Sequence, residues 1–373
     1  ATDFDGNPRP IDGDGDGIPI VDIGAFEFGA EAEPSFTDVF VFGNSLSDTG
    51  NLAAFRDTVG GVPIGTIGLC HPVDIVEGCG RLFFEESRVS NGPVAVERLA
   101  TRLDFEGLQP SLHVLSFFGV DPTEPGTNYA VAGGHAAPPD PDDLEDVLPA
   151  LPGQIAAFFA DLPKRGLPAP PSSALYVIFI GGNDVREARG AFISPPPMGE
   201  TPESIIADAI SAIDTSIRQL ITAGARTFLV VNVVDVGSLP ETRIVAEAVE
   251  ELLGIPAEVI ITSTTGLTIE FNRQLADRLG QIRLEQELTG NPVELREFDL
   301  FTFFNSIRAA SLFGFVNTDD ACFDSTVYSA TGDRVFHPDC GEDEFDTFVF
   351  FDAIHPTGRV HAFVANALSA VVD

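Results

Sequence analysis

The feature that most constrains the fold is the alternation of short apolar runs with helical segments from about residue 36 onward. Four of the apolar runs are short and continuous enough to be strands that are buried on both faces. They cover residues 39–42, 129–132, 175–180 and 227–234. Amphipathic segments between them predict helices, and strand–helix alternation predicts a parallel sheet with helices on both faces. The expected fold class is therefore α/β with three layers.

The helical segments carry start and stop signals. One helix is expected to begin after Thr201, which suits an N-cap, with Pro202 in its first turn and Gly224 at its C-terminal stop. Its apolar residues recur at spacings of three and four and are Ile206, Ile210, Ile213, Ile217 and Leu220. A shorter helix is predicted around residues 155–162, and a closing helix around residues 360–371.

Composition divides the chain into two parts. Residues 1–33, here called the N-terminal extension, are rich in Asp, Gly and Pro, whereas residues 34–373 carry the strand–helix alternation. A chain of 373 residues is long enough for a large α/β domain with a sizeable core. We therefore expect an acidic extension followed by one α/β domain.

The N-terminal extension contains half of a calcium-loop pattern. Asp12, Asp14 and Asp16 alternate with glycines, as in the first half of an EF-hand loop. The second half does not match, because the last ligand position is Ile23 and either Asp22 or Glu27 would have to substitute. Two interpretations stay open, which are a structural calcium ion held by these aspartates and a plain acidic linker.

The charge of the chain excludes some classes of partner. Acidic residues number 57 and basic residues 20, giving a net charge of -37. Such a chain repels phosphate backbones and anionic membrane surfaces, so nucleic acid is excluded as a partner. The apolar runs all fall short of the roughly 20 residues that span a bilayer, so no transmembrane segment is expected. The excess charge itself is read as a solvated acidic coat.

The cysteines indicate the compartment. Cys70, Cys79, Cys322 and Cys340 are the only cysteines, and more than one pairing is open to them. Short loops favour the sequential pairing, Cys70 with Cys79 and Cys322 with Cys340. Disulfides require an oxidising compartment, so we expect a secreted protein whose signal peptide has already been removed.

Ser45 is the first candidate for chemistry. It follows the strand expected at residues 39–42 and lies in the string GNSLSDTGN. Open parallel sheets build their active sites at the carboxyl ends of their strands. A serine at such an end, followed by small turn-forming residues, is a candidate nucleophile.

Three distant segments supply the other parts that acyl transfer requires, which are a base, a group that orients the base, and donors to an oxyanion. Residues 128–134, NYAVAGG, place glycines after the second strand, where a backbone N–H can be exposed. Residues 180–184, IGGND, place a carboxamide after the third strand. Residues 352–357, DAIHPT, place a carboxylate three positions before a histidine.

Together these blocks resemble the SGNH, or GDSL, hydrolase family, named for its serine, glycine, asparagine and histidine. The resemblance covers about residues 36–373. It implies a flavodoxin-like αβα sandwich with a central, mostly parallel sheet of about five strands. It also implies a GDSL-type esterase or lipase that cleaves carboxylic esters without a cofactor, acting on a small-molecule or lipid ester.

The resemblance assigns a role to each hallmark residue. Ser45 would attack the ester carbonyl, His355 would accept its proton, and Asp352 would orient the imidazole. The oxyanion would be bound by the Ser45 N–H, the Gly133 N–H and the Asn183 side-chain amide. Among the histidines of the chain, His355 alone has both a nearby aspartate and the family block.

Two positions need comment. Gly133, rather than Gly134, matches the family spacing from Asn128. Asn44 stands where the family usually has aspartate. Asparagine keeps an acceptor oxygen for the turn but removes a negative charge beside the nucleophile, so we expect an active enzyme with altered rate or pH dependence.

Two further functional interpretations stay open. A phospholipase or lipid acyltransferase would use the same acyl-enzyme and differ in its substrate or in what attacks the intermediate. A non-catalytic, calcium-stabilised surface binding module is the alternative of another class. Asn44 and the aspartates of the N-terminal extension favour it, whereas the complete set of hallmark residues argues against it.

Overall fold

The computed structural model describes most of the chain from residue 36 onward. The described residues are 36–52, 88–114, 124–139, 141–142, 149–194, 200–309, 313–324, 327, 333, 335–341 and 344–372. The aspartates expected to bind calcium (Asp12, Asp14, Asp16 and Asp22), together with Cys70 and Cys79, lie outside these residues. The described residues from Asp38 onward belong to one compact unit.

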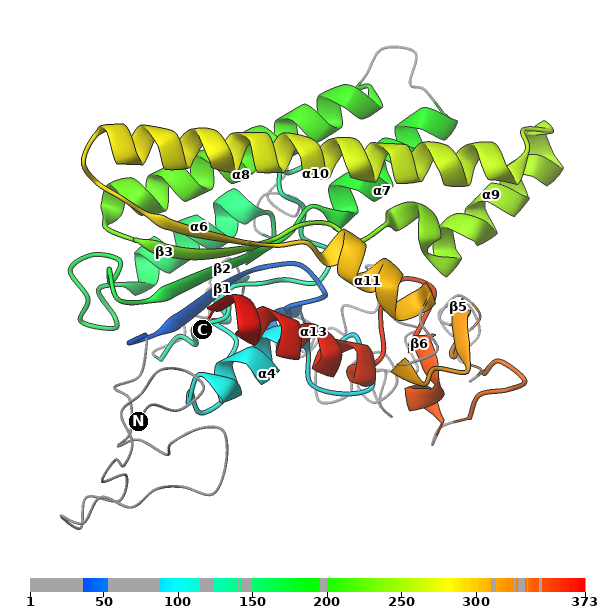
Figure 1. The fold of residues 1–373 in the computed structure, drawn as a ribbon, viewed down its shortest axis with the longest axis horizontal. Helices are drawn as coiled ribbons and strands as arrows, with labels where there is room; N and C mark the ends of the chain where they lie inside the picture. Colours follow the sequence, from blue (N-terminus) through cyan, green and yellow to red (C-terminus); the bar gives the residue numbers. More distant parts are fainter. Residues whose placement is uncertain are drawn as a thin grey trace, which may run out of the picture. The chain divides into compact units, whose positions relative to one another are not determined.

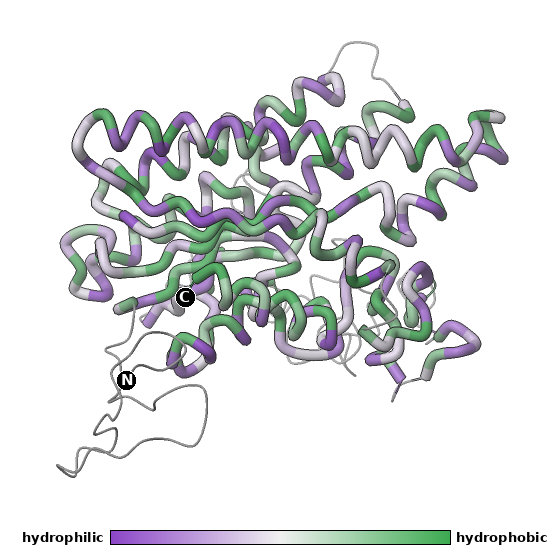
Figure 2. The backbone as a smooth tube through the Cα atoms, viewed as in Figure 1, coloured by the Kyte–Doolittle hydropathy of each residue, from purple (hydrophilic) through white to green (hydrophobic). Residues whose placement is uncertain are grey.

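A parallel four-stranded sheet forms the centre of this unit (Figure 1). Its strands lie in the order β1 (Val39–Gly43), β2 (Leu175–Phe179), β3 (Thr227–Val231) and β4 (Glu294–Phe298). All residues of β1 and β2 are buried, and the central strands are hydrophobic in Figure 2. Continuous burial is what a strand covered on both faces requires. The predicted parallel sheet is therefore confirmed, with four strands among the described residues where about five were expected.

Helices cover both faces of the sheet. Figure 1 shows α6, α7, α8 and α10 on one face and α4 and α13 on the other. The α-helices are α4 (Ala95–Arg102), α6 (Leu151–Asp161), α7 (Gly182–Ile193), α8 (Pro202–Ala223), α9 (Pro240–Leu253), α10 (Ala257–Leu288), α11 (Leu300–Ala309) and α13 (Gly358–Val372). Short 3₁₀ helices span Val236–Ser238 and Phe345–Thr347. The three-layer α/β fold class is thus confirmed.

The helix predicted from its capping residues is α8. The Thr201 side chain accepts a hydrogen bond from the Ser204 N–H at 3.2 Å, Pro202 begins the helix, and Gly224 ends it with a φ of 128°. A positive φ suits glycine because it has no Cβ. The apolar stripe of α8 is buried in the helical layer.

One predicted strand, residues 129–132, is not a strand in the structure. This segment lies beside β1 but forms only an isolated bridge to it, at Asn128, and the Val131 N–H donates to the Gly43 carbonyl at 3.1 Å. The Asn51 side-chain amide donates to two carbonyls of the segment at 2.9 and 2.8 Å. A side chain, rather than a neighbouring strand, therefore satisfies part of the segment's backbone.

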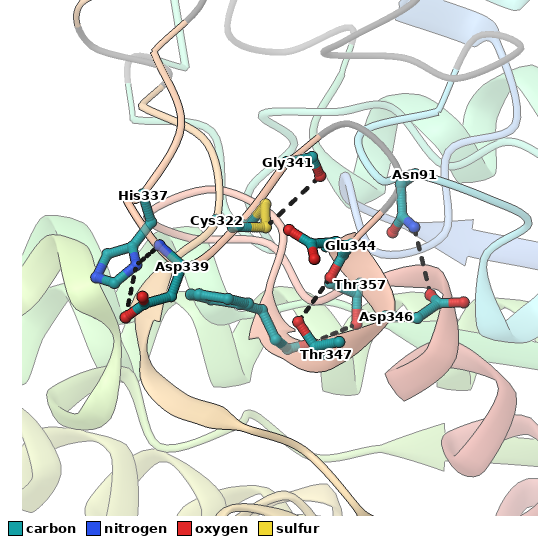
Figure 3. The surroundings of a disulfide bond; sticks show 11 residues. Asn91, Cys322, His337, Asp339, Gly341, Glu344, Asp346, Thr347 and Thr357 are labelled. Atoms are coloured by element: carbon teal, nitrogen blue, oxygen red, sulfur yellow. Dashed lines mark hydrogen bonds and ion pairs between the residues drawn. A yellow bond between two sulfur atoms is a disulfide. The ribbon is translucent and has the colours of Figure 1, made fainter.

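A small second sheet lies near the C-terminus. It pairs β5 (Asn317–Ala321) with β6 (Phe348–Phe350). Cys322 and Cys340 form a disulfide beside it, with Cα atoms 5.5 Å apart (Figure 3), as the sequential pairing predicts. A cluster of buried aromatic rings surrounds this disulfide, including Phe323, Phe345, Phe348 and Phe351. None of the described helices combines the length and apolar character needed to cross a membrane.

Candidate active site

Ser45 lies in a tight turn directly after β1. We call residues 44–48 the serine turn. The Asn44 carbonyl accepts the N–H groups of Ser47 and Asp48, both at 3.0 Å. The Asn44 side-chain oxygen accepts the Leu46 N–H at 3.1 Å. Asparagine thus supplies the acceptor that an aspartate would supply at this position.

The strand end beneath the serine turn is held by two close contacts. Gln154 of α6 receives the Gly43 N–H at 2.8 Å and donates to the Gly43 carbonyl at 2.7 Å. A Cβ at Gly43 would lie 2.6 Å from the Phe179 carbonyl oxygen of β2. Only glycine fits there, so the approach of β2 fixes where the serine turn begins.

Asp48 joins the serine turn to the segment that carries the glycines. Its carboxylate accepts the N–H groups of Gly50 and Asn51 at 2.8 and 2.7 Å, and that of Ala132 at 2.8 Å. Burial raises the pKa of Asp48, and these hydrogen bonds oppose the rise. Asp48 therefore stabilises the turn after Ser45 and also holds the turn against Ala132.

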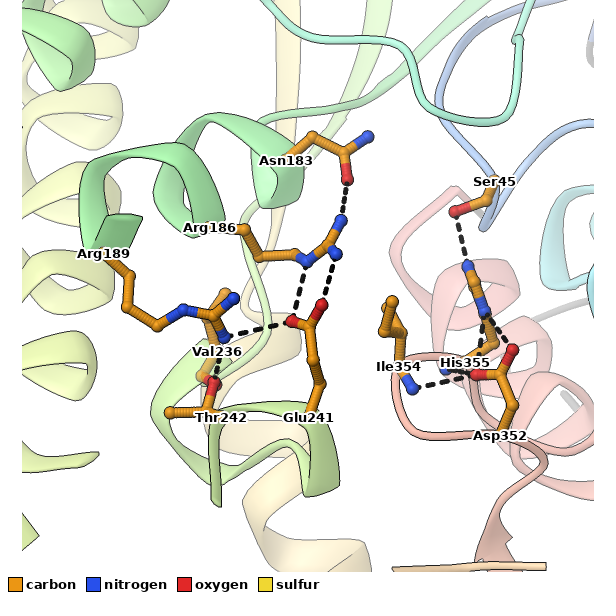
Figure 4. A network of polar contacts seen from close by, with 10 residues as sticks. All are labelled: Ser45, Asn183, Arg186, Arg189, Val236, Glu241, Thr242, Asp352, Ile354 and His355. Atoms are coloured by element: carbon orange, nitrogen blue, oxygen red, sulfur yellow. Dashed lines mark hydrogen bonds and ion pairs between the residues drawn. The ribbon is translucent and has the colours of Figure 1, made fainter. Parts of the chain in front are cut away.

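Asp352 and His355 lie in the loop between β6 and α13, here called the histidine loop (residues 352–355). His355 Nδ1 is 2.9 Å and 3.0 Å from the two carboxylate oxygens of Asp352 (Figure 4). The same carboxylate accepts the N–H groups of Ile354 and His355 at 2.8 and 2.7 Å. Burial tends to raise the pKa of Asp352, but His355 and the hydrogen bonds lower it below its ordinary value.

The histidine loop reaches the serine turn. His355 Nε2 is 2.9 Å from Ser45 Oγ. When Nδ1 carries the ring proton and donates it to Asp352, Nε2 has a lone pair that accepts the serine O–H. The three side chains therefore form one hydrogen-bonded chain from hydroxyl to carboxylate, which can draw a proton from Ser45.

The glycine segment and Asn183 lie next to each other. Asn183, the second residue of α7, donates from Nδ2 to the Gly134 carbonyl at 2.9 Å. Gly133 has a φ of 86° and no heavy atom within 4 Å of where a Cβ would stand. A Cβ at Gly134, in contrast, would lie 2.6 Å from the Pro149 carbonyl oxygen. Gly133 is thus the glycine beside open space, and Gly134 is the packed one.

Asp184 has a role that the sequence did not indicate. Its position after Asn183 predicts a helix cap, but both of its oxygens accept the Ala136 N–H, at 3.0 and 2.9 Å, and one accepts the Ala137 N–H at 3.2 Å. Burial raises the pKa of Asp184 to about 6. Asp184 therefore holds the loop after Gly134 against the start of α7.

Two charged residues near the site were also missed. Arg186 donates to the Asn183 side-chain oxygen at 3.0 Å, and Glu241 pairs with Arg186. The spacing of three between Asn183 and Arg186 on one helix is a sequence signal that could have found the first contact. Glu241 is remote in sequence, and no local pattern indicates it.

Two other histidines are not part of this hydrogen-bonded chain. His361 of α13 is buried and accepts the Ala95 N–H at Nδ1, and His135 lies 3.6 Å from Glu187. Within the described ranges, no group of three or more side chains is arranged to hold a metal ion. Calcium binding by the N-terminal extension stays a prediction.

Sequence comparison now gives the class of protein. A sequence model of the family described as GDSL-like lipase/acylhydrolase matches residues 39–368. The chain belongs to this family, which confirms the resemblance seen in its motifs. It is thereby placed among the carboxylic ester hydrolases.

Two relatives from Arabidopsis thaliana match nearly the whole domain. GDSL esterase/lipase LIP-4 is 26% identical in a 355-residue alignment that covers 88% of this chain and 84% of the relative. Inactive GDSL esterase/lipase-like protein 25 is 23% identical in a 337-residue alignment that covers 88% of this chain and 70% of the relative. The relatives thus include a protein named as an esterase and one named as inactive.

Proposed function

We propose that this protein is a secreted serine hydrolase that cleaves carboxylic esters through an acyl-enzyme on Ser45. The observation that supports this most is the hydrogen-bonded chain from Ser45 Oγ through His355 to Asp352, with both links at 2.9 Å. This is the arrangement that activates a serine hydroxyl. Secretion is supported by the Cys322–Cys340 disulfide, because such bonds persist in oxidising compartments.

The proposed reaction has two halves. His355 takes the Ser45 proton as the oxygen attacks the ester carbonyl, and the resulting oxyanion accepts hydrogen bonds from the Ser45 and Gly133 N–H groups and the Asn183 amide. The intermediate then expels the alcohol, which takes the proton from His355. Water repeats the sequence on the acyl-enzyme and releases the acid. The depressed pKa of Asp352 keeps it charged, so it stabilises the imidazolium in both halves.

The non-catalytic alternative rests on Asn44 and on the relative named as inactive. Against this alternative, the Asn44 side chain still accepts the Leu46 N–H, so asparagine keeps a hydrogen bond that orders the serine turn. A phospholipase or acyltransferase would use the same residues, and replacing water by an acceptor alcohol would separate transfer from hydrolysis.

Hydrolysis of p-nitrophenyl esters of increasing chain length tests the proposal. We expect turnover by the native protein and none above background for Ser45→Ala. Ser306→Ala is the matched control, because Ser306 lies exposed on α11 and its hydroxyl donates to the Phe303 carbonyl of the same helix. Equal turnover by Ser45→Ala and the native protein would overturn the proposal.

A further inference from the structure

A partly buried ion pair links the two halves of the candidate site, which are Asn183 and the histidine loop. Asn183 belongs to the start of α7, and the histidine loop follows β6. Figure 4 shows Arg186 next to Asn183 and Glu241 next to Arg186. The mechanism assigns neither residue a role, so their contacts need a separate explanation.

The first contact fixes the orientation of the Asn183 amide. Arg186 Nη1 donates to Asn183 Oδ1 at 3.0 Å, and Asn183 Nδ2 donates to the Gly134 carbonyl at 2.9 Å. A guanidinium can only donate and a carbonyl can only accept, so both partners demand the same orientation of the amide. The second Nδ2–H is then available for an oxyanion. The positive charge of the Arg186 guanidinium, next to Oδ1, also polarises the amide and strengthens the Nδ2–H donor.

The second contact fixes Arg186. Arg186 Nε is 2.9 Å from one Glu241 oxygen, and Nη2 bonds the other, so the pairing is bidentate. Arg189 adds a contact at 3.0 Å to the same carboxylate. The side chains of Arg186 and Glu241 are only 28% and 20% exposed. Such a partly buried, bidentate pair holds the guanidinium in one place.

The third contact reaches the histidine loop. The Glu241 N–H donates to the Ala353 carbonyl at 2.8 Å, and Ala353 lies between Asp352 and His355 in sequence. Glu241 is the second residue of α9, where a helix leaves its N–H groups without partners inside the helix. The start of α9 therefore holds the histidine loop with its backbone while it holds Arg186 with a side chain.

We propose that Arg186 and Glu241 are positioning residues that set the Asn183 amide for the oxyanion and couple it to the histidine loop. This inference rests on the proposed function for its catalytic consequence, but not for the orientation of the amide. A purely structural ion pair would affect folding stability and leave the turnover of folded protein unchanged. The two possibilities are therefore separable.

Kinetics of Arg186→Met provide the first test. We expect kcat to fall about 10- to 100-fold with little change in KM, because the lost orientation matters most when the oxyanion forms. Arg218→Met is the matched control, since Arg218 bonds two carboxylates, Asp214 and Glu285, in the helical layer. Its kcat should stay native. Glu241→Gln keeps the backbone bond to Ala353 and should lower kcat by a smaller factor.

A double-mutant cycle asks whether Arg186 acts through Asn183. Arg186→Met should lower kcat strongly in the native background and hardly at all in the Asn183→Ala background. Equal losses in both backgrounds would overturn the inference. If Arg186→Met does not fold, Arg186→Lys takes its place in the cycle, because it keeps a charge but loses the bidentate pairing to Glu241.

A crystal structure of Arg186→Met separates this inference from the proposed function. We expect the Asn183 amide to leave its native orientation. If it does so in a protein whose native form hydrolyses no ester, the proposed function fails and the positioning role stands. If the native protein hydrolyses esters while the amide and kcat are both unchanged in Arg186→Met, the positioning role fails and the function stands.

Discussion

The serine turn and the histidine loop meet at one hydrogen bond, but they are held in different ways. The serine turn extends from β1 in the fully buried part of the sheet, and Gln154 and Asp48 tie it to two further segments. The histidine loop extends from the small sheet of β5 and β6, beside the Cys322–Cys340 disulfide. The nucleophile thus follows a strand of the central sheet, whereas its base follows the small sheet and the aromatic cluster around the disulfide.

The pKa values of the buried carboxylates in the two regions shift in opposite directions. Burial raises the pKa of Asp48 in the serine turn, so acid does not weaken that region through this group. In the histidine loop the pKa of Asp352 is lowered. Its contribution to folding stability is therefore complete when the pH is above the ordinary pKa of an aspartate, and it is lost as the pH falls through the lowered pKa of Asp352. Acid is therefore expected to disturb the base before the nucleophile.

The largest effect is expected from Asp352→Asn. The variant should keep the hydrogen bonds of the loop in part but lose the charge that orients and stabilises the imidazolium. We expect kcat to fall about a thousandfold to ten-thousandfold, with a smaller fall in unfolding temperature because the charge that stabilises the folded loop is lost. Ester hydrolysis and thermal unfolding measure the two quantities, and a loss of less than tenfold would contradict the role given to Asp352.

Removal of the Cys322–Cys340 disulfide should have the next largest effect. Replacing both cysteines by serine is expected to cost about 2–4 kcal/mol in the stability of the C-terminal region. Hydrogen exchange should show reduced protection in β6 and residues 352–357, while β1 and β2 keep theirs. Equal loss of protection in β1 would show that the two regions are not held independently.

Protonation of the buried His361 should lower the stability of the C-terminal region as the pH falls. Burial lowers its pKa to about 3, and His355 and Arg98 contribute. An unfolded chain takes up this proton near pH 6.5, so stability is complete above about pH 6.5 and falls by about 1.4 kcal/mol per pH unit toward the folded pKa.

Urea unfolding of His361→Gln between about pH 4 and about pH 7 tests whether His361 causes this loss of stability in acid. Glutamine can still accept the Ala95 N–H but does not titrate. The stability of the variant should therefore depend less steeply on pH than that of the native protein. Parallel pH profiles for the two proteins would assign the acid sensitivity to other groups.

The smallest effect is expected from Asn44→Asp. The Asn44 oxygen already accepts the Leu46 N–H, so the turn should not change, and the added charge should alter kcat by about tenfold or less and shift its pH profile. Kinetics over a pH series measure both. Robust turnover by Asn44→Asp from an inert native chain would mean that the natural protein is a pseudoenzyme.

How much the sequence revealed depended on whether the information was local. Strands β1 to β3 were visible as continuous apolar runs, but β4 was missed because Glu294, Arg296 and Glu297 interrupt its apolar residues at the edge of the sheet. The segment at 129–132 was apolar enough to be predicted as a strand, yet it lies beside an isolated bridge to β1, and the remote Asn51 side chain binds the Asn128 and Ala130 carbonyls.

The candidate site follows the same rule. Ser45, Asn183 and His355 stand in short motifs, each at the end of an apolar run, so their positions could be predicted. Gln154 and Glu241 act through partners that are 111 and 55 residues away. Such contacts arise only when the helices pack, and no periodicity in the chain encodes them.

The most direct test of the central claim is to find where a fluorophosphonate probe bonds to the native protein. Such probes react with an activated serine and leave a stable adduct, which peptide mass spectrometry can locate. We predict one adduct, on Ser45, that is absent from Ser45→Ala and strongly slowed in His355→Ala. An unlabelled native protein, or labelling that persists in Ser45→Ala, would contradict the assignment of Ser45 as the nucleophile.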